Sequence, residues 1–319
     1  MSSDEKINAA RFYFEYKGHT IPDLTAFHKT TVTTRPGAPI VYFAGDSSLD
    51  NKFWVSWHSS AGNEPSVSIP RIYKDALNRP RPRPDVAFWL NHFLGETATA
   101  INTAVEASLL RERNKQKLLD QDQFIRDHVE SKDVIIVSVG SNDIAMKPTL
   151  STILHMLLLA WLTPLSSIQN GTAWGLQYFR RLFKSRVEEY VTKLVGKNKP
   201  RAVIVCMIYF PLEAQATKQK GWADVPLRAL GYNGSPGRLQ TAIQKMYELG
   251  TQKIQISEVN VIPMALYEVM DGKNADDYVE RVEPSIEGGC KMAARLADEI
   301  KRLLGDEEDD IEGNRERQN

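Results

Sequence analysis

The stretch VYFAGDSSLD, residues 41–50, decides the fold. Its apolar run ends on Gly45-Asp46-Ser47, which is typical of a tight turn after a buried strand. A second stretch, SKDVIIVSVGSND at 131–143, has the same form, because an apolar strand is followed there by Gly140-Ser-Asn142. Since sites form where parallel strands end at their carboxyl edge, we expect these two turns to lie close together.

Further apolar segments predict the rest of the architecture. Apolar residues recur three and four positions apart within 174–197, which predicts a helix with one buried face. The runs at 201–211 and 259–269 are typical of buried strands, and a last helical pattern reaches residue 304. Strands and helices that alternate in this way predict an α/β fold, a three-layer α/β/α sandwich around a central, mostly parallel sheet.

The length of 319 residues fits one domain with terminal additions. We expect an N-terminal extension over 1–36, an α/β domain over 37–304 and a disordered acidic tail over 305–319, which is nearly devoid of apolar residues. The segment 51–85 contains a PRPRP run and is predicted to be a long surface loop.

Composition limits the classes of partner. Forty Lys and Arg balance forty Asp and Glu, so net charge recruits neither nucleic acid nor an anionic membrane. The two cysteines and an N-terminus without an apolar leader favour a reducing, cytoplasmic location. Scattered histidines and cysteines, with no phosphate-binding or dinucleotide motif, predict neither a metal site nor a cofactor.

Two motifs carry a family resemblance. AGDSS at 44–48 and VGSND at 139–143 resemble the first and third signature blocks of the SGNH or GDSL hydrolase family, whose fold is flavodoxin-like. The succession of elements fits that family from about residue 38 to 304. The resemblance implies that Ser47 is a nucleophile and Asn142 an oxyanion donor.

The chemistry of those residue types agrees with such roles. A serine in a strand-to-helix turn exposes its hydroxyl, while its own N–H and a nearby carboxamide can face a developing oxyanion. The simpler alternative is that Ser47 and Asn142 are ordinary turn residues, which these residue types often are.

The family's second block supplies a glycine N–H to the oxyanion. Its best match is INTAVEASLL at 101–110, where Ala107 takes the glycine's place and keeps a backbone donor. An alternative placement at 91–99 offers Gly95 instead, although with an unusually long gap before the third block. We prefer Ala107, while noting that Glu106 beside it would oppose a developing negative charge.

The last block departs from the family. Where the family has aspartate and histidine three residues apart, this chain has Glu280 and Glu283, and no histidine follows His155. Three alternatives stay open: Glu283 is the base, tuned or oriented by Glu280; His58 or His155 has taken over; or hydrolysis is weak or lost.

The protonation of Glu283 decides between these alternatives. A carboxylate with an ordinary pKa of about 4.3 is a poor base for a serine hydroxyl. Burial beside a second carboxylate would raise that pKa, whereas an ion pair with Arg281 would keep the glutamate ionised and inert.

One apolar stretch bears on the substrate. The segment 149–165, TLSTILHMLLLAWLTPL, is shorter than the roughly 20 apolar residues that span a bilayer. Three roles are open for it: a lid or acyl-chain wall beside Ser47, a face for membrane or dimer contact, or a buried core helix. We prefer the buried core helix, and membrane contact is not favoured.

These observations support two main hypotheses. The first is a serine esterase or acyl hydrolase with an altered triad that acts on small-molecule esters with apolar acyl groups. The second is an inactive binding or interaction protein that keeps the fold, and an acyltransferase is a third possibility. Neither the substrate nor the oligomeric state follows from the sequence.

Overall fold

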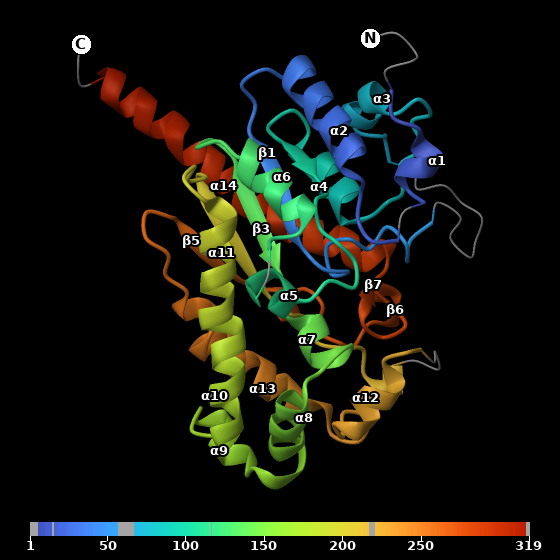
Figure 1. The fold of residues 1–319 in the computed structure, drawn as a ribbon, viewed down its shortest axis with the longest axis vertical. Helices are drawn as coiled ribbons and strands as arrows, with labels where there is room; N and C mark the ends of the chain where they lie inside the picture. The colour runs from blue at the N-terminus through green and yellow to red at the C-terminus, as the bar shows by residue number, and fades with distance from the viewer. Residues whose placement is uncertain (1–5, 15, 57–66, 116, 217–220, 317–319) are drawn as a thin grey trace.

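The computed structural model describes residues 6–14, 16–56, 67–115, 117–216 and 221–316, with side chains up to 305. A five-stranded parallel sheet in the order β2-β1-β3-β4-β5 forms its centre (Figure 1). The strands are β1 (Ile40–Gly45), β2 (Thr99–Ile101), β3 (Val134–Ser138), β4 (Ala202–Met207) and β5 (Val261–Ala265).

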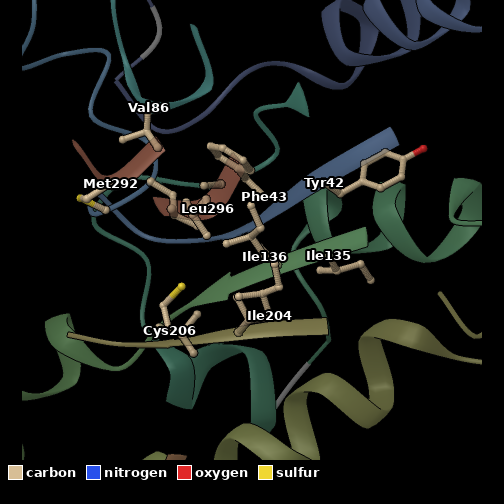
Figure 2. Close-up of a cluster of buried hydrophobic side chains, with 14 of the residues drawn as sticks. Tyr42, Phe43, Val86, Ile135, Ile136, Ile204, Cys206, Met292 and Leu296 are labelled. Carbon is tan, nitrogen blue, oxygen red and sulfur yellow. The ribbon is translucent and has the colours of Figure 1, made fainter. Parts of the chain in front are cut away.

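Helices cover both faces of the sheet. On one face α4 (Val86–Leu94) packs against α14 (Ile286–Glu316), and on the other α6 (Asp120–His128) packs against α11 (Val187–Val195). Figure 2 shows Val86, Met292 and Leu296 from the first pair beside Phe43, whereas Tyr42 points away. The strands are apolar throughout because both of their faces are buried, and the predicted three-layer sandwich is confirmed.

Further elements complete the chain. They include α1 (Ala9–Phe12), α2 (Ile21–Thr34), α3 (Arg71–Ala76), α5 (Leu110–Lys115), α7 (Ser141–Ala145), α8 (Leu150–Leu157), α9 (Leu165–Gln169), α10 (Trp174–Arg180), α12 (Asp224–Ala229) and α13 (Pro236–Leu249). Two π-helical segments, η2 (Leu158–Leu162) and η3 (Arg181–Arg186), extend α8 and α10, and β6 (Tyr278–Val279) pairs with β7 (Glu283–Pro284) as a small hairpin.

The strand order creates the place for a site. β1 pairs with β2 on one side and with β3 on the other, so the connections that leave β1 and β3 go to opposite edges of the sheet. In doubly wound sheets this switch point opens a crevice at the carboxyl ends of the strands. The register pairs Gly45 with Ser138, so the turns that follow β1 and β3 begin side by side at the carboxyl edge of the sheet.

The described part of the N-terminal segment is integral to the domain. Ile7, Phe12, Leu24 and Phe27 are buried members of the hydrophobic core. α2 begins at the Thr20 cap and packs against α3 and β2. The aromatic residues of this segment have no helical period because they come from several short elements, so their burial was not apparent in the sequence.

Two predictions about loops and tails were wrong. The segment 51–85 is not simply a surface loop, because Asn51 and Lys52 are fully buried and α3 forms within it. The final helix does not end near residue 304 but continues through the acidic segment to Glu316. Glutamate and arginine are good helix formers, so the helix propagates beyond the residues that pack on the sheet.

Candidate active site

The turn after β1 is built around the Asp46 carboxylate. One oxygen of Asp46 accepts from the Ser48 backbone N–H at 3.1 Å and from the Ser48 hydroxyl at 2.8 Å. The other oxygen accepts from the Ser141 hydroxyl at 2.5 Å. Asp46 therefore joins the turn that carries Ser47 to the first residue of α7.

Glycine is required where β1 ends. A Cβ at Gly45 would lie 2.8 Å from both the Leu49 side chain and the Ser138 carbonyl oxygen. Only glycine lets the turn approach β3 this closely.

Asn142 lies in the first turn of α7, directly after β3. Its side chain is buried, and Nδ2 donates to the Ser108 carbonyl at 3.1 Å. This bond uses one of the two amide hydrogens and fixes the carboxamide. Asn142 and Ser47 line the same cavity, so the two turns converge as the sequence predicted.

Ala107 lies in the loop that follows β2. The Val105 N–H donates to the Gly45 carbonyl at 3.0 Å, which holds this loop beside the Ser47 turn. Ala107 has φ 60°, a left-handed conformation that favours glycine. It does not itself contribute to the cavity lining, and its N–H has no hydrogen-bond partner among the described residues.

The alternative placement of the second block is wrong. Gly95 ends α4 and precedes β2, whose first residue, Thr99, pairs with Ile40 at the start of β1. Gly95 therefore lies at the amino edge of the sheet, whereas Ser47 follows the carboxyl edge.

Glu106 belongs to a buried polar cluster. Its N–H donates to Asp50 at 3.1 Å and its carboxyl accepts from the Trp54 indole at 2.8 Å. Asp50 in turn forms a fully buried ion pair with Lys52. Burial, followed by the Asp50 charge, raises the pKa of Glu106 to about 8. The glutamate is therefore mainly neutral at pH 7 and opposes an oxyanion less than its residue type suggested.

The last sequence block forms the β6–β7 hairpin. The Val282 N–H donates to the Val279 carbonyl at 3.3 Å, and both central residues, Glu280 and Arg281, have positive φ, as in a type I′ turn. This conformation is costly for residues other than glycine.

Arg281 offsets that cost by its contacts. Its guanidinium pairs with Asp224 at 2.8 Å and donates to the Leu212 carbonyl and the Asn233 side chain. The alternative in which Arg281 pairs with Glu280 or Glu283 and keeps it ionised is wrong, because the guanidinium pairs with Asp224 instead.

Glu283 follows this turn in β7, is 4% exposed, and lines the cavity together with Ser47. Burial raises the pKa of Glu283 to about 7; the Ser47 hydroxyl opposes this rise, the Asp46 and Glu280 charges add to it, and the Trp222 side chain opposes it. Neither donor contact has the geometry of a full hydrogen bond, and Oε2 is buried without a partner among the described residues.

Glu280 does not line the cavity. Its carboxylate accepts from the backbone N–H of Trp222 at 3.3 Å. It acts on Glu283 only through its charge.

The cavity has a volume of about 300 Å³ and is mostly apolar. The segment 149–165 supplies one wall of it through Ile153, Met156, Leu157, Leu159 and Ala160. The preferred prediction of a buried core helix is wrong, because Leu150 is 86% exposed and Leu154 53% exposed. Other apolar lining residues are Ile144, Phe179, Ile208, Leu227, Leu230, Leu239, Ile243 and Met246.

No histidine of the described chain lines this cavity. His155 stacks on Trp174 and Tyr178, with ring centroids 4.7 and 4.4 Å away, and its Nδ1 lies 2.7 Å from the Ser151 carbonyl. His58 is outside the described residues. Within the ranges given above, no three His, Cys, Asp or Glu side chains are grouped as metal ligands would be.

Two residues of the cavity were missed in the sequence. Tyr209 lines it and donates to the Val282 carbonyl at 2.6 Å, which holds the strand that carries Glu283. Its position just after β4, within the apolar run at 201–211, was an available signal. Trp222 comes from a segment without periodicity, so only the fold reveals that it reaches Glu283.

No protein-family model and no curated protein matches the chain. A carbohydrate acetylesterase from Sinorhizobium meliloti is 13% identical, with 83% of this chain and 99% of that chain covered and a TM-score of 0.41. A phospholipase A1 from Streptomyces albidoflavus NA297 is 12% identical, covering 82% and 100%, with a TM-score of 0.41. An aryl esterase from M. smegmatis is 13% identical, covering 83% and 100%, with a TM-score of 0.39. Any functional inference therefore rests on the geometry of the cavity.

Proposed function

We propose that this protein is a serine acyl hydrolase of the SGNH type in which Glu283 replaces the histidine base. One observation carries the proposal: the Glu283 carboxyl, with a pKa of about 7, lines the same cavity as Ser47 and interacts with its hydroxyl. At neutral pH such a group is about half ionised, which is the range in which general bases work best.

The acylation step uses Glu283 as base and then as acid. The carboxylate removes the Ser47 proton while the hydroxyl oxygen attacks the ester carbonyl. The tetrahedral intermediate then collapses, the alcohol leaves with the proton from protonated Glu283, and the acyl group remains on Ser47. Water, deprotonated by Glu283, releases the carboxylic acid in the second half of the cycle.

The oxyanion is stabilised by three donors in this proposal. They are the N–H of Ser47, the N–H of Ala107 and the Asn142 carboxamide hydrogen that Ser108 does not use. The φ of 60° at Ala107 lies in the left-handed region that favours glycine, the residue expected at this place from the family's second block. Loss of one such donor typically lowers kcat about 10²- to 10³-fold.

Burial mainly sets the basicity of Glu283, and Glu280 and Trp222 adjust it. A histidine base works with a carboxylate partner, which stabilises the imidazolium. A carboxylate base instead needs a hydrogen-bond donor that orients it but lowers its pKa only a little. Trp222 is the proposed donor, and burial, with the Asp46 and Glu280 charges, keeps the pKa high.

The apolar cavity indicates the substrate class. Most of its lining residues are apolar, and the polar ones are a few side chains such as Ser47, Asn142 and Glu283. The acyl part of an ester would therefore contact mainly hydrocarbon. We propose esters with an apolar acyl chain of several carbons as substrates. A short acetyl ester would leave much of the cavity empty and would be hydrolysed more slowly.

Turnover of p-nitrophenyl esters of increasing chain length tests the proposal. Ser47→Ala and Glu283→Gln should each lower kcat/KM by about 10⁴-fold or more, because nucleophile and base act as one unit. Glu287→Gln is the matched control, since Glu287 is exposed near the start of α14. Turnover that Ser47→Ala leaves unchanged would contradict the proposal.

A binding protein is the second candidate. The observation in its favour is that the described cavity lining contains no histidine. This candidate predicts no turnover in any variant but retained binding of a fluorescent fatty acid in the cavity. Turnover that depends on Ser47 and Glu283 would exclude it.

A further inference from the structure

Large apolar side chains are exposed at one end of the molecule, where α8, α9 and the start of α10 lie (Figure 1). Leu150 is 86% exposed, Leu162 75% and Trp174 66%. We call this surface the apolar tip; its members are Leu150, Leu154, Leu157, Trp161, Leu162, Leu165 and Trp174. A group of exposed apolar side chains of this kind marks an interaction surface.

The apolar tip continues into the cavity. Leu157 is 41% exposed and also lines the cavity, and the same is true of Ile153 at 37%. Trp222, likewise 37% exposed, lines the cavity from α12's side. A molecule held at the apolar tip would therefore lie next to the entrance that an acyl chain uses.

Positive charge flanks the apolar tip along the chain. Residues 144–187 contain five Lys and Arg and no Asp or Glu, although the whole chain has no net charge. Lys147, Arg180 and Arg181 are exposed. Arg181 lies seven residues after Trp174 on a continuous helical segment, so it is two turns, or about 10 Å, farther from the end of the molecule on the same face.

We infer that the apolar tip docks on an anionic phospholipid surface. Leucine and tryptophan side chains enter the boundary between headgroups and acyl chains, while Lys147, Arg180 and Arg181 contact the headgroup phosphates. No helix in the described chain is long and apolar enough to cross a membrane, so the contact is interfacial. That docking supplies the cavity with its substrate rests on the proposed function; the docking itself does not.

A second copy of the chain fits this surface less well. In a symmetric dimer the same surface meets itself, so the cations that flank the apolar tip would face one another. Like charges across an interface disfavour association. An anionic lipid surface satisfies the apolar and the charged groups together.

Flotation of the full chain with vesicles tests the inference. Ser47→Ala is used, so that binding is measured without hydrolysis. We expect binding to vesicles of phosphatidylcholine with phosphatidylserine, weaker binding to phosphatidylcholine alone, and loss of the difference at high salt. Binding that persists while ester turnover is absent would leave this inference intact and remove only the proposed function.

Surface variants locate the contact. Leu150→Ser with Leu162→Ser should weaken binding about tenfold or more, because buried apolar area sets interfacial affinity. Arg180→Gln with Arg181→Gln should weaken binding to the anionic vesicles about 30-fold. Phe14→Ser and Lys29→Gln are the matched controls, since Phe14 is exposed in the turn after α1 and Lys29 is exposed on α2.

Two results would overturn the inference. One is the absence of binding to either vesicle type. The other is a concentration-dependent dimer in sedimentation equilibrium that the Leu150→Ser and Leu162→Ser changes dissociate, since the apolar tip would then be a subunit interface.

Discussion

The Glu283 carboxyl and the Ser47 side chain line one cavity, although they come from opposite ends of the chain. Burial raises the pKa of the carboxyl to about 7, and the hydroxyl stabilises its charged form. A shared cavity and a carboxyl that titrates near neutral pH are the two properties on which the proposed roles of Ser47 and Glu283 rest.

The pH dependence of hydrolysis follows from this pKa. Glu283 works only as the carboxylate, so kcat/KM should rise tenfold per pH unit below about 7 and level off above it. A pH–rate profile with a p-nitrophenyl ester measures this. A rate that falls as pH rises through 7 would contradict a carboxylate base.

Glu280 and Trp222 should shift that profile in opposite directions. Glu280→Gln removes a like charge and lowers the pKa of Glu283, so the profile moves to lower pH. Trp222→Phe keeps an aromatic ring but removes the indole donor, so the pKa of Glu283 rises and the profile moves to higher pH. Above that raised pKa the rate should return to the native value. Equal losses at every pH would indicate only structural damage.

Glu283 should also make stability depend on pH. Its pKa is about 7 in the folded chain and about 4.5 in the unfolded chain, so the folded state binds the proton more tightly. The folded state is therefore destabilised as pH rises from 4.5 to 7, by as much as about 3 kcal/mol. Glu283→Gln should raise the free energy of unfolding at pH 8 and change it much less at pH 4.

Urea unfolding of both proteins at the two pH values measures that difference. Glu287→Gln, at an exposed position, should give the same change at pH 4 and at pH 8. An equal effect of Glu283→Gln at both values would show that its pKa is not raised.

Ala107→Gly tests the oxyanion loop. The left-handed φ of 60° costs alanine more than glycine, so the change should stabilise the fold by up to about 1 kcal/mol. It keeps the backbone N–H, so kcat should not fall. A large loss of kcat without a loss of stability would place the alanine methyl group, rather than its N–H, in the site.

The sheet and the main turns could be predicted because their signals are local. Apolar runs that end on small polar residues indicate buried parallel strands. The carboxyl ends of those strands indicate which edge of the sheet holds the site. The segment 149–165 could not be assigned, because an apolar helix has the same sequence pattern whether it faces a core or a cavity. Burial of Asn51 and Lys52 was hidden because polar residues are buried only with partners, and those partners are distant in sequence.

The candidate site was predictable in its residues but not in its electrostatics. The motifs identified Ser47, Asn142 and Glu283. That Arg281 turns away to Asp224 and that Trp222 reaches Glu283 depends on the hairpin turn, for which the sequence has no glycine or asparagine signal.

The reaction of Ser47 with a fluorophosphonate, mapped by mass spectrometry, tests whether Glu283 activates this hydroxyl. We expect stoichiometric labelling at Ser47 in the native chain, near-complete loss in Glu283→Gln, and labelling with an altered pH dependence in Glu283→His. Labelling of Ser47 that proceeds equally fast in Glu283→Gln, or an unlabelled Ser47 in the folded native chain, would contradict it.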